Sequence, residues 1–204
     1  WRSRRTTIRG LLNCIYVLMG KQKETSITKI IEIPEGITFT LDGTLLTAKK
    51  EDKEIVRKIN SILDGSVDGN KITLKSPRTT KRDRKIIGTN VAHINNMIKG
   101  LTEGFKYKLQ VANVHFPMNV SFDKANNHVV VKNFLGEKKD RLINVVEGVN
   151  VKVDKENIEL DSHDIEKAGQ TAANIEKGTK VRNKDRRIFQ DGIFITEKPG
   201  RVFI

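Results

Sequence analysis

The sequence predicts an α+β protein with two duplicated domains, each an antiparallel-rich sheet packed with one main helix. Three observations support this. Hydrophobic residues make up 37% and charged residues 31%, which is typical of a folded chain. Each half contains a proline followed by a strand, a turn and a second strand, and each half then has one helix. We expect an N-terminal domain over residues 27–112 and a C-terminal domain over residues 113–204, the latter with a basic segment and a short tail.

The first half begins with the pattern of a β-hairpin. Apolar residues alternate with threonines over residues 37–41, the two-residue period of a strand with one buried face. The pair Asp42-Gly43 favours a two-residue turn, and residues 44–48 can form the return strand. Pro34 stands just ahead of the strand, where a missing amide donor does least harm.

The second half repeats this order. Residues 115–122 predict a strand and include a proline near their start, residues 123–127 predict a turn, and residues 128–132 predict the return strand. Such elements are common enough for chance to produce the agreement. We favour duplication because strands, turn and helix follow in the same order.

One helix is predicted in the first half. Apolar residues recur at three- and four-residue steps over residues 91–101, with Thr89 or Asn90 available as a cap and Gly100 near the end. Residues 52–63 are ambiguous, because their isoleucines fit both helical and strand spacing. The local pattern favours a short helix there. Two Asp-Gly turn signals then precede residues 71–75, which predict a strand.

The helix of the second half has clearer limits. Its apolar stripe covers residues 165–175. Ser162 or Asp164 can cap its start, and Gly178 can end it.

The first 26 residues differ from the rest. Four arginines precede a short apolar run, and Met19 follows. A signal or transit peptide has a similar pattern. We prefer the alternative that Met19 is the initiator and residues 1–18 are an upstream extension. We therefore expect residues 1–26 to lie outside the folded core.

The charge balance favours a polyanionic partner. The chain has 38 Lys and Arg against 25 Asp and Glu, a net charge of +13. An anionic membrane surface would also attract it, but no stretch of about 18 apolar residues could span a bilayer. The single cysteine, Cys14, allows no internal disulfide and no cysteine-based zinc site, which fits a reducing compartment.

Catalytic and ligand-binding motifs are not found in the sequence. No two histidines have metal-ligand spacing, and residues 100–106 lack the pattern of a phosphate-binding loop. Asp161 and Asp164 are explained by helix capping. His93 is expected to be a surface or interface residue. We therefore expect no enzyme activity, cofactor, metal or small-molecule substrate.

Two basic runs stand out, residues 75–85 and 177–187, each with six positive charges and one negative charge in turn-like sequence. Charge runs are often only solvated surface, but arginines that can fork onto phosphates favour nucleic acid. Phe189 and Phe194 alternate with isoleucines like core residues, so recognition of RNA backbone and shape is favoured over base stacking. The candidate RNA-binding residues are Lys75, Arg78, Lys81, Arg82, Arg84, Lys85, Lys177, Lys180, Arg182, Lys184, Arg186 and Arg187.

Four segments carry a resemblance to a known family: residues 96–108, 115–117, 133–138 and 181–194. They resemble protein six of the large ribosomal subunit, the universal L-six family, which is called L-nine in eukaryotes. The last is close to the archaeal and eukaryotic signature, in which an arginine, a phenylalanine and an Asp-Gly pair keep this spacing. The resemblance covers residues 27 to about 198.

The resemblance implies a duplicated α+β protein of the cytosolic ribosome. Such a protein lies among neighbouring ribosomal proteins on large-subunit rRNA, near the sarcin–ricin loop and the elongation-factor docking site. Residues 177–187 correspond to its RNA-facing segment, and residues 52–63 would be extended rather than helical. The chain departs from the family at residues 50–53, where Gly-Pro-x-Gly is usual, and at Lys177, where a glutamine is expected.

Two alternatives from other classes remain open at this point. The chain could be an RNA-binding regulatory protein outside the ribosome. It could also be an enzyme with a basic cleft for a phosphorylated substrate, although the sequence shows no convergent polar groups for such a pocket.

Overall fold

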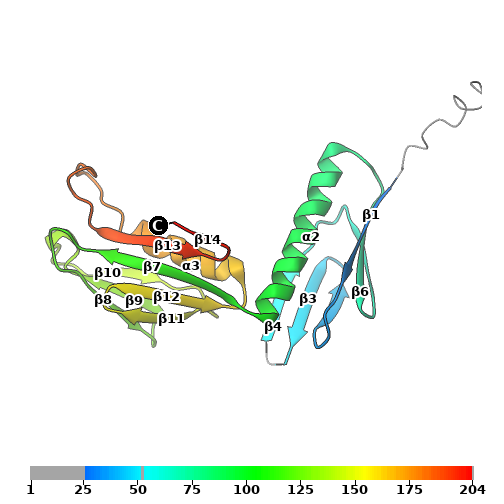
Figure 1. Cartoon of the computed structure of the whole chain (residues 1–204), viewed down its shortest axis with the longest axis horizontal. Helices are drawn as coiled ribbons and strands as arrows, with labels where there is room; N and C mark the ends of the chain where they lie inside the picture. The colour runs from blue at the N-terminus through cyan, green and yellow to red at the C-terminus, as the bar shows by residue number, and fades with distance from the viewer. Residues whose placement is uncertain (1–25, 52, 204) are drawn as a thin grey trace, which may run out of the picture.

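The computed structural model describes residues 26–51 and 53–203, which form two α+β units side by side (Figure 1). The elements of the first unit are β1 (Ile27–Glu32), β2 (Thr38–Asp42), β3 (Leu45–Lys50), β4 (Lys53–Lys58), β5 (Asp64–Asp68), β6 (Lys71–Ser76) and α2 (Lys81–Thr102). Those of the second are β7 (Phe105–Ala112), β8 (Asn119–Asp123), β9 (His128–Lys132), the 3-10 turn η1 (Phe134–Gly136), β10 (Arg141–Asn144), β11 (Asn150–Asp154), β12 (Asn157–Ser162), α3 (Ile165–Gly178), β13 (Gly192–Lys198) and β14 (Arg201–Val202). The expected extension, residues 1–26, lies outside the described residues except for residue 26.

The α+β class and the duplication are confirmed by the sheet topology. In the first unit the sheets have the orders β1-β6-β5 and β2-β3-β4, and in the second β7-β12-β11 and β8-β9-β10. The second unit adds β13 and β14 beside β7. The register repeats as well, because buried Ser76 pairs with Ile27 at the start of β1, and buried Ser162 pairs with Phe105 at the start of β7.

Strand β7 corrects the expected boundary between residues 112 and 113. The strand pairs with β12 and β13, and its buried residues Tyr107, Leu109 and Val111 belong to the core of the second unit. It is the counterpart of β1 and therefore begins the second repeat. The sequence did not show this, because the alternating pattern of β7 is compatible with pairing to strands that precede it or to strands that follow it in the sequence.

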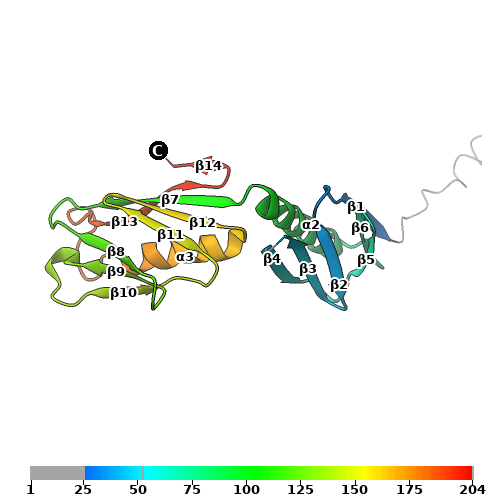
Figure 2. The same cartoon turned by 90° about the horizontal axis from the view of Figure 1, so that it is seen from below.

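Each unit has its own core between its two sheets and its helix. In the first unit, Ile87, Ile94 and Leu101 of α2 are buried against strand residues that include Leu46 and Leu74. In the second unit, the sheets meet along β8 and β11, and α3 fills the space between β10 and β7 (Figure 2). The positions of both sheets therefore depend on the helix.

Helix α2 is longer than the sequence predicted. The expected caps Thr89 and Asn90 lie inside the helix, where their side chains donate to carbonyls one turn earlier. The cap is Thr80, whose hydroxyl accepts from the Asp83 amide and donates to the Asp83 carboxylate. The helix begins at Lys81, so it contains the second part of the first basic run.

The other sequence predictions have mixed outcomes. The short helix favoured locally over residues 52–63 is wrong, and β4 has the extended form that the resemblance implied. Ile55 of β4 is buried in the core, and the backbone hydrogen-bonding groups of β4 pair with those of β3. Helix α3 is capped by Asp164 and ends at Gly178, as predicted. The hairpin strands β2, β3 and β9 and the strand β6 also form as expected.

The two units are joined closely. Glu103 and Gly104 alone separate α2 from β7, and Arg57 of β4 donates a hydrogen bond to Glu166 in the first turn of α3. The backbone of Gly100 lies against the carbonyl of His163, so tightly that a Cβ on residue 100 would overlap that oxygen. The contact is therefore between backbones as well as side chains.

Candidate nucleic-acid interface

Three of the segments that resemble the ribosomal family meet at one end of the second unit. The Asn133 side-chain amide donates to the Pro117 carbonyl at 2.9 Å. The Phe116 ring packs on Gly136, 3.5 Å from where a Cβ would stand. Asn133 and Leu135 have positive φ angles of 57° and 51°. Asn adopts this conformation readily, but Leu rarely does, which indicates that the surrounding contacts fix the turn.

Arg141 of β10 holds the beginning of the basic loop, which we define as residues 179–191. Its guanidinium donates to both carboxylate oxygens of Glu137 at 2.8 and 2.6 Å, and to the Gly178 carbonyl at 2.8 Å. It also lies over the buried Phe134 ring, 4.1 Å from its centre. The hydrogen bonds from Arg141 lower the pKa of Glu137, so the carboxylate stays charged.

Asp191 holds the other end of the basic loop. Its carboxylate is 2% exposed and accepts from the backbone amides of Val114 and His115. The His115 ring, whose Nδ1 is 3.6 Å from Asp191, also stacks at a tilt on Phe189 with 5.3 Å between ring centres. Because a buried carboxylate needs hydrogen-bond donors, Asp191 ties residues 189–191 to the loop after β7.

Inside these two anchors the basic loop is partly packed. The Thr179 hydroxyl donates to the Ile175 carbonyl at 3.0 Å and accepts from the Ile193 amide at 3.1 Å, which joins α3 to β13. Val181 is buried in the core. Asp185 accepts from the Arg187 amide at 2.9 Å and so forms a local turn. The loop is therefore held in one shape by contacts within the protein.

All six candidate residues of the second run are exposed, on the basic loop or at the end of α3. Within residues 26–51 and 53–203, none of the six forms an ion pair, although Lys184 lies over the Phe189 ring at 4.7 Å. Lys177, Lys180 and Arg186 come together around one hollow beside Phe194.

Phe194 corrects one expectation from the sequence. Its pattern predicts a core residue, but it is 41% exposed, whereas the adjacent Ile193 is 1% exposed. Successive side chains of strand β13 point to opposite faces of the sheet, so Ile193 faces the core and Phe194 faces outward. Phe189, which has the same sequence pattern, does pack against the core.

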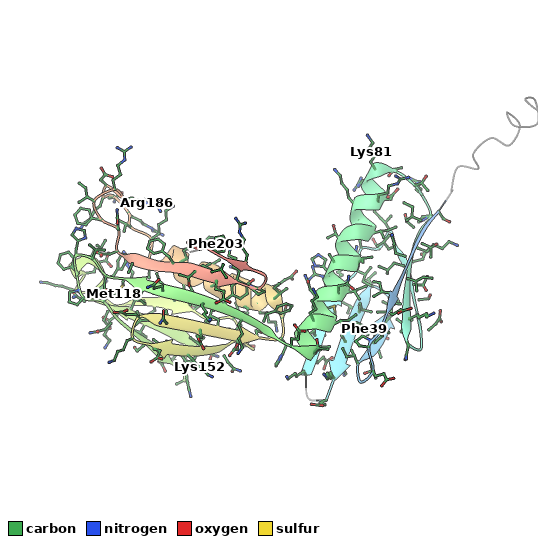
Figure 3. The ribbon with its side chains drawn as sticks, in the orientation of Figure 1. Phe39, Lys81, Met118, Lys152, Arg186 and Phe203 are labelled. Atoms are coloured by element: carbon green, nitrogen blue, oxygen red, sulfur yellow. The ribbon has the colours of Figure 1, made fainter. Side chains whose placement is uncertain are left out.

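The first basic run lies elsewhere. Lys75 is on β6, Arg78 is in the loop before α2, and the other four residues, Lys81, Arg82, Arg84 and Lys85, form the start of α2 rather than a turn. All six are exposed, and none forms an ion pair within the described part of the chain. Figure 3 shows Lys81 and Arg186 at opposite ends of the molecule, so the structure does not bring the two runs together.

Comparisons with known proteins decide the family. The family model of ribosomal protein L6 matches residues 33–104 and 116–192. The chain belongs to the ribosomal protein L6 family. The large ribosomal subunit protein uL6 of Methanococcus vannielii is 43% identical over 173 residues, 84% of this chain and 94% of the relative. That of Staphylothermus marinus is 41% identical over 168 residues, 81% and 91% of the two chains, and that of Aeropyrum pernix 37% over 178 residues, 86% and 97%.

Ribosomal protein L6 is a structural component of the ribosome and not an enzyme, as the sequence led us to expect of this chain. In the described part of the chain, no helix is long and apolar enough to cross a membrane, and no group of three or more His, Cys, Asp or Glu could hold a metal ion. His93, expected at a surface or interface, lies on α2 with Nδ1 3.8 Å from Glu166 of the second unit. Burial is the main cause that lowers the pKa of His93.

Sequence analysis missed Arg141 and Asp191, the two residues that anchor the basic loop of this L6 family member. Arg141 contacts Gly178 from 37 positions away, and Asp191 contacts His115 from 76 positions away. No local pattern indicates such contacts. The one available signal was the Asp-Gly pair of the family signature, whose aspartate is the anchor and whose glycine, Gly192, lies under the Phe194 ring.

Replacing Arg141 by methionine should raise the pKa of Glu137 toward its usual value, because the hydrogen bonds to the charged form are lost. In the native protein the depressed pKa contributes stability above the unfolded pKa, and this contribution is lost as the pH falls through the folded pKa. The Glu137 titration can be followed by NMR of its carboxyl carbon. Replacing Lys184 by methionine is the control, since Lys184 acts on Glu137 only through distance-dependent attraction and should shift the midpoint much less. Equal shifts in the two variants would contradict the assignment of Arg141 as the main cause.

Proposed function

We propose that this chain is a structural constituent of the large ribosomal subunit that supports translation and binds large-subunit rRNA near the sarcin–ricin loop and the elongation-factor docking region. It would lie there among neighbouring ribosomal proteins of the cytosolic ribosome. The observation that carries the proposal is the basic loop, residues 179–191, with its exposed cations and two anchored ends.

The shape of this loop suits an RNA backbone. Its cations are free of ion pairs within the described residues, so they can approach phosphates without first losing a carboxylate partner. Because Arg141 and Asp191 fix the loop in the free protein, binding requires less ordering of the chain. These two features favour contact with a folded RNA whose phosphates have fixed positions.

The first basic run supplies a second contact in this proposal. Lys81, Arg82, Arg84 and Lys85 surround the amino end of α2, where the helix dipole is also positive. The two runs lie at opposite ends of the molecule, so they would contact separate parts of the RNA. Together they would fix the orientation of the chain on a large RNA surface.

Replacing Arg186 and Arg187 together by alanine should weaken binding to a large-subunit rRNA fragment and make it less salt-sensitive. Each lost phosphate contact should reduce the slope of log affinity against log salt by about 0.7 to 0.9. The slope is measured by filter binding from low to moderate salt, with folding checked by circular dichroism.

The matched control removes two lysines from another surface. Lys152 and Lys155 are exposed on and beside β11, and Figure 3 shows Lys152 on the side of the second unit away from Arg186. Their double alanine variant loses the same charge but should keep most of the affinity and the slope. If both double variants weaken binding equally, net charge rather than the basic loop would account for it, and the proposed site would be wrong.

A further inference from the structure

A hollow of 240 Å³ opens between the last turns of α3 and the outer face of β13. Its lining combines an aromatic ring, three cations, one carboxylate and one methyl group. The lining residues are Ala173, Glu176, Lys177, Lys180, Arg186 and Phe194. The cations belong to the basic loop or precede it, so the hollow is continuous with the proposed rRNA surface.

The position of Phe194 is the first step. The ring is 41% exposed although the same strand buries Ile193 almost completely. It lies back over Gly192, and a Cβ there would meet the ring atoms at 3.1 and 3.3 Å. Gly192 is not among the described residues with a positive φ angle, so the backbone conformation does not require a glycine here. The missing Cβ instead leaves room for the Phe194 ring. The chain thus holds an aromatic ring outside its core, against the hollow.

The charges are the second step. Lys177, Lys180 and Arg186 form no ion pair among the described residues, and neither does Glu176. A bare phosphate would be held by the cations alone and would be repelled by Glu176. A nucleotide can interact with every one of these groups. Its base can stack on the Phe194 ring, the N–H groups of the base can donate hydrogen bonds to Glu176, and its phosphates can pair with the cations.

We propose that this hollow receives one unpaired RNA base, stacked on Phe194, while Lys177, Lys180 and Arg186 hold the flanking phosphates. The inference rests on the proposed rRNA-binding function and specifies how the same surface distinguishes an unpaired base from a continuous duplex. It replaces the expectation of backbone recognition alone with backbone recognition plus one stacked base.

A second exposed phenylalanine provides the comparison. Phe203 is 45% exposed, but its ring is already covered by Lys198 at 5.0 Å and Arg201 at 4.8 Å from the same hairpin. It does not line the hollow that Phe194 shares with the basic loop. Replacing Phe203 by leucine therefore removes an equally exposed ring without touching the proposed base site.

The test uses an RNA hairpin with one bulged 2-aminopurine and the same hairpin without the bulge. The wild-type chain should bind the bulged hairpin more tightly by roughly five- to a hundredfold, the range that one base–aromatic stack supplies, and should quench the 2-aminopurine fluorescence. Phe194→Leu should lose the preference and the quenching but keep the salt slope on the unbulged hairpin. Phe194→Tyr should keep both, and Phe203→Leu should match the wild type.

The outcomes separate the two proposals. If the wild type binds both hairpins equally, or if Phe194→Leu keeps the preference, the base site is wrong while rRNA binding through the basic loop still stands. If Phe203→Leu alone loses the preference, the stacked base lies at the carboxyl end and the inference is also wrong. If neither hairpin binds and the rRNA fragment does not bind either, both proposals fail.

Discussion

Replacing Gly100 by alanine is expected to separate the two units of the protein. The added Cβ would overlap the His163 carbonyl oxygen and would stand 3.0 Å from the Phe105 ring. His163 lies between β12 and α3, so its backbone cannot yield without disturbing both. Overpacking of this kind costs about 1–3 kcal/mol, and here the relief available is to move one unit away from the other.

The same movement should break the side-chain contact between the units. Arg57 of β4 and Glu166 of α3 would lose their hydrogen bond, and His93 would become more exposed to water. Small-angle X-ray scattering should therefore show a larger radius of gyration for Gly100→Ala. Thermal unfolding should show a lower midpoint, or two separate transitions in place of a joint one.

Gly88 on the same helix is the matched control. A Cβ there meets nothing within 4 Å, so Gly88→Ala should gain up to about 1 kcal/mol from helix propensity without any clash. The scattering curve should remain that of the wild type. Identical behaviour of the two alanine variants would show that the backbone contact at Gly100 does not hold the units together.

Replacing Asp191 by alanine should have the second large effect, because it removes the anchor at the end of the basic loop. The Val114 and His115 amides would be left without their acceptor. A buried donor that loses its partner costs about 1–3 kcal/mol, so the two together should destabilise the second unit by roughly 2–6 kcal/mol. Urea unfolding measures this change, and amide exchange over residues 179–191 should become faster.

The rRNA affinities of aspartate variants distinguish the effect of the loop's shape from the effect of its charge. Asp191→Ala removes one negative charge, which by itself would favour RNA, yet we expect weaker binding because the loop must then be ordered on the RNA. Asp154→Ala removes the same charge from an exposed position at the end of β11, away from the basic loop, and should keep or improve binding. Asp191→Asn should fall between, since its amide oxygen can still accept one hydrogen bond. If Asp191→Ala binds rRNA as tightly as Asp154→Ala, the anchor has no role in recognition.

Local features of the sequence determined much of this protein. The alternation in β2, the valine run of β9, the Asp-Gly turn after β2, and the limits of α3 at Asp164 and Gly178 follow from contacts within a few residues. The exposure of all twelve candidate cations was also predictable, because an unpaired charge cannot be buried at acceptable cost. The sequence motifs by themselves were specific enough to indicate the L6 family.

The tertiary structure alone decided the rest. Strand β7 could pair with either unit, and only its partners β12 and β13 assign it to the second. The outward turn of Phe194 depended on which face of β13 was covered. Arg141 and Asp191 hold the basic loop through hydrogen bonds between residues 37 to 77 positions apart in the chain. Apolar contacts and hydrogen bonds form between groups that are close in space. A sequence pattern predicts such a contact only when the two residues are also close along the chain.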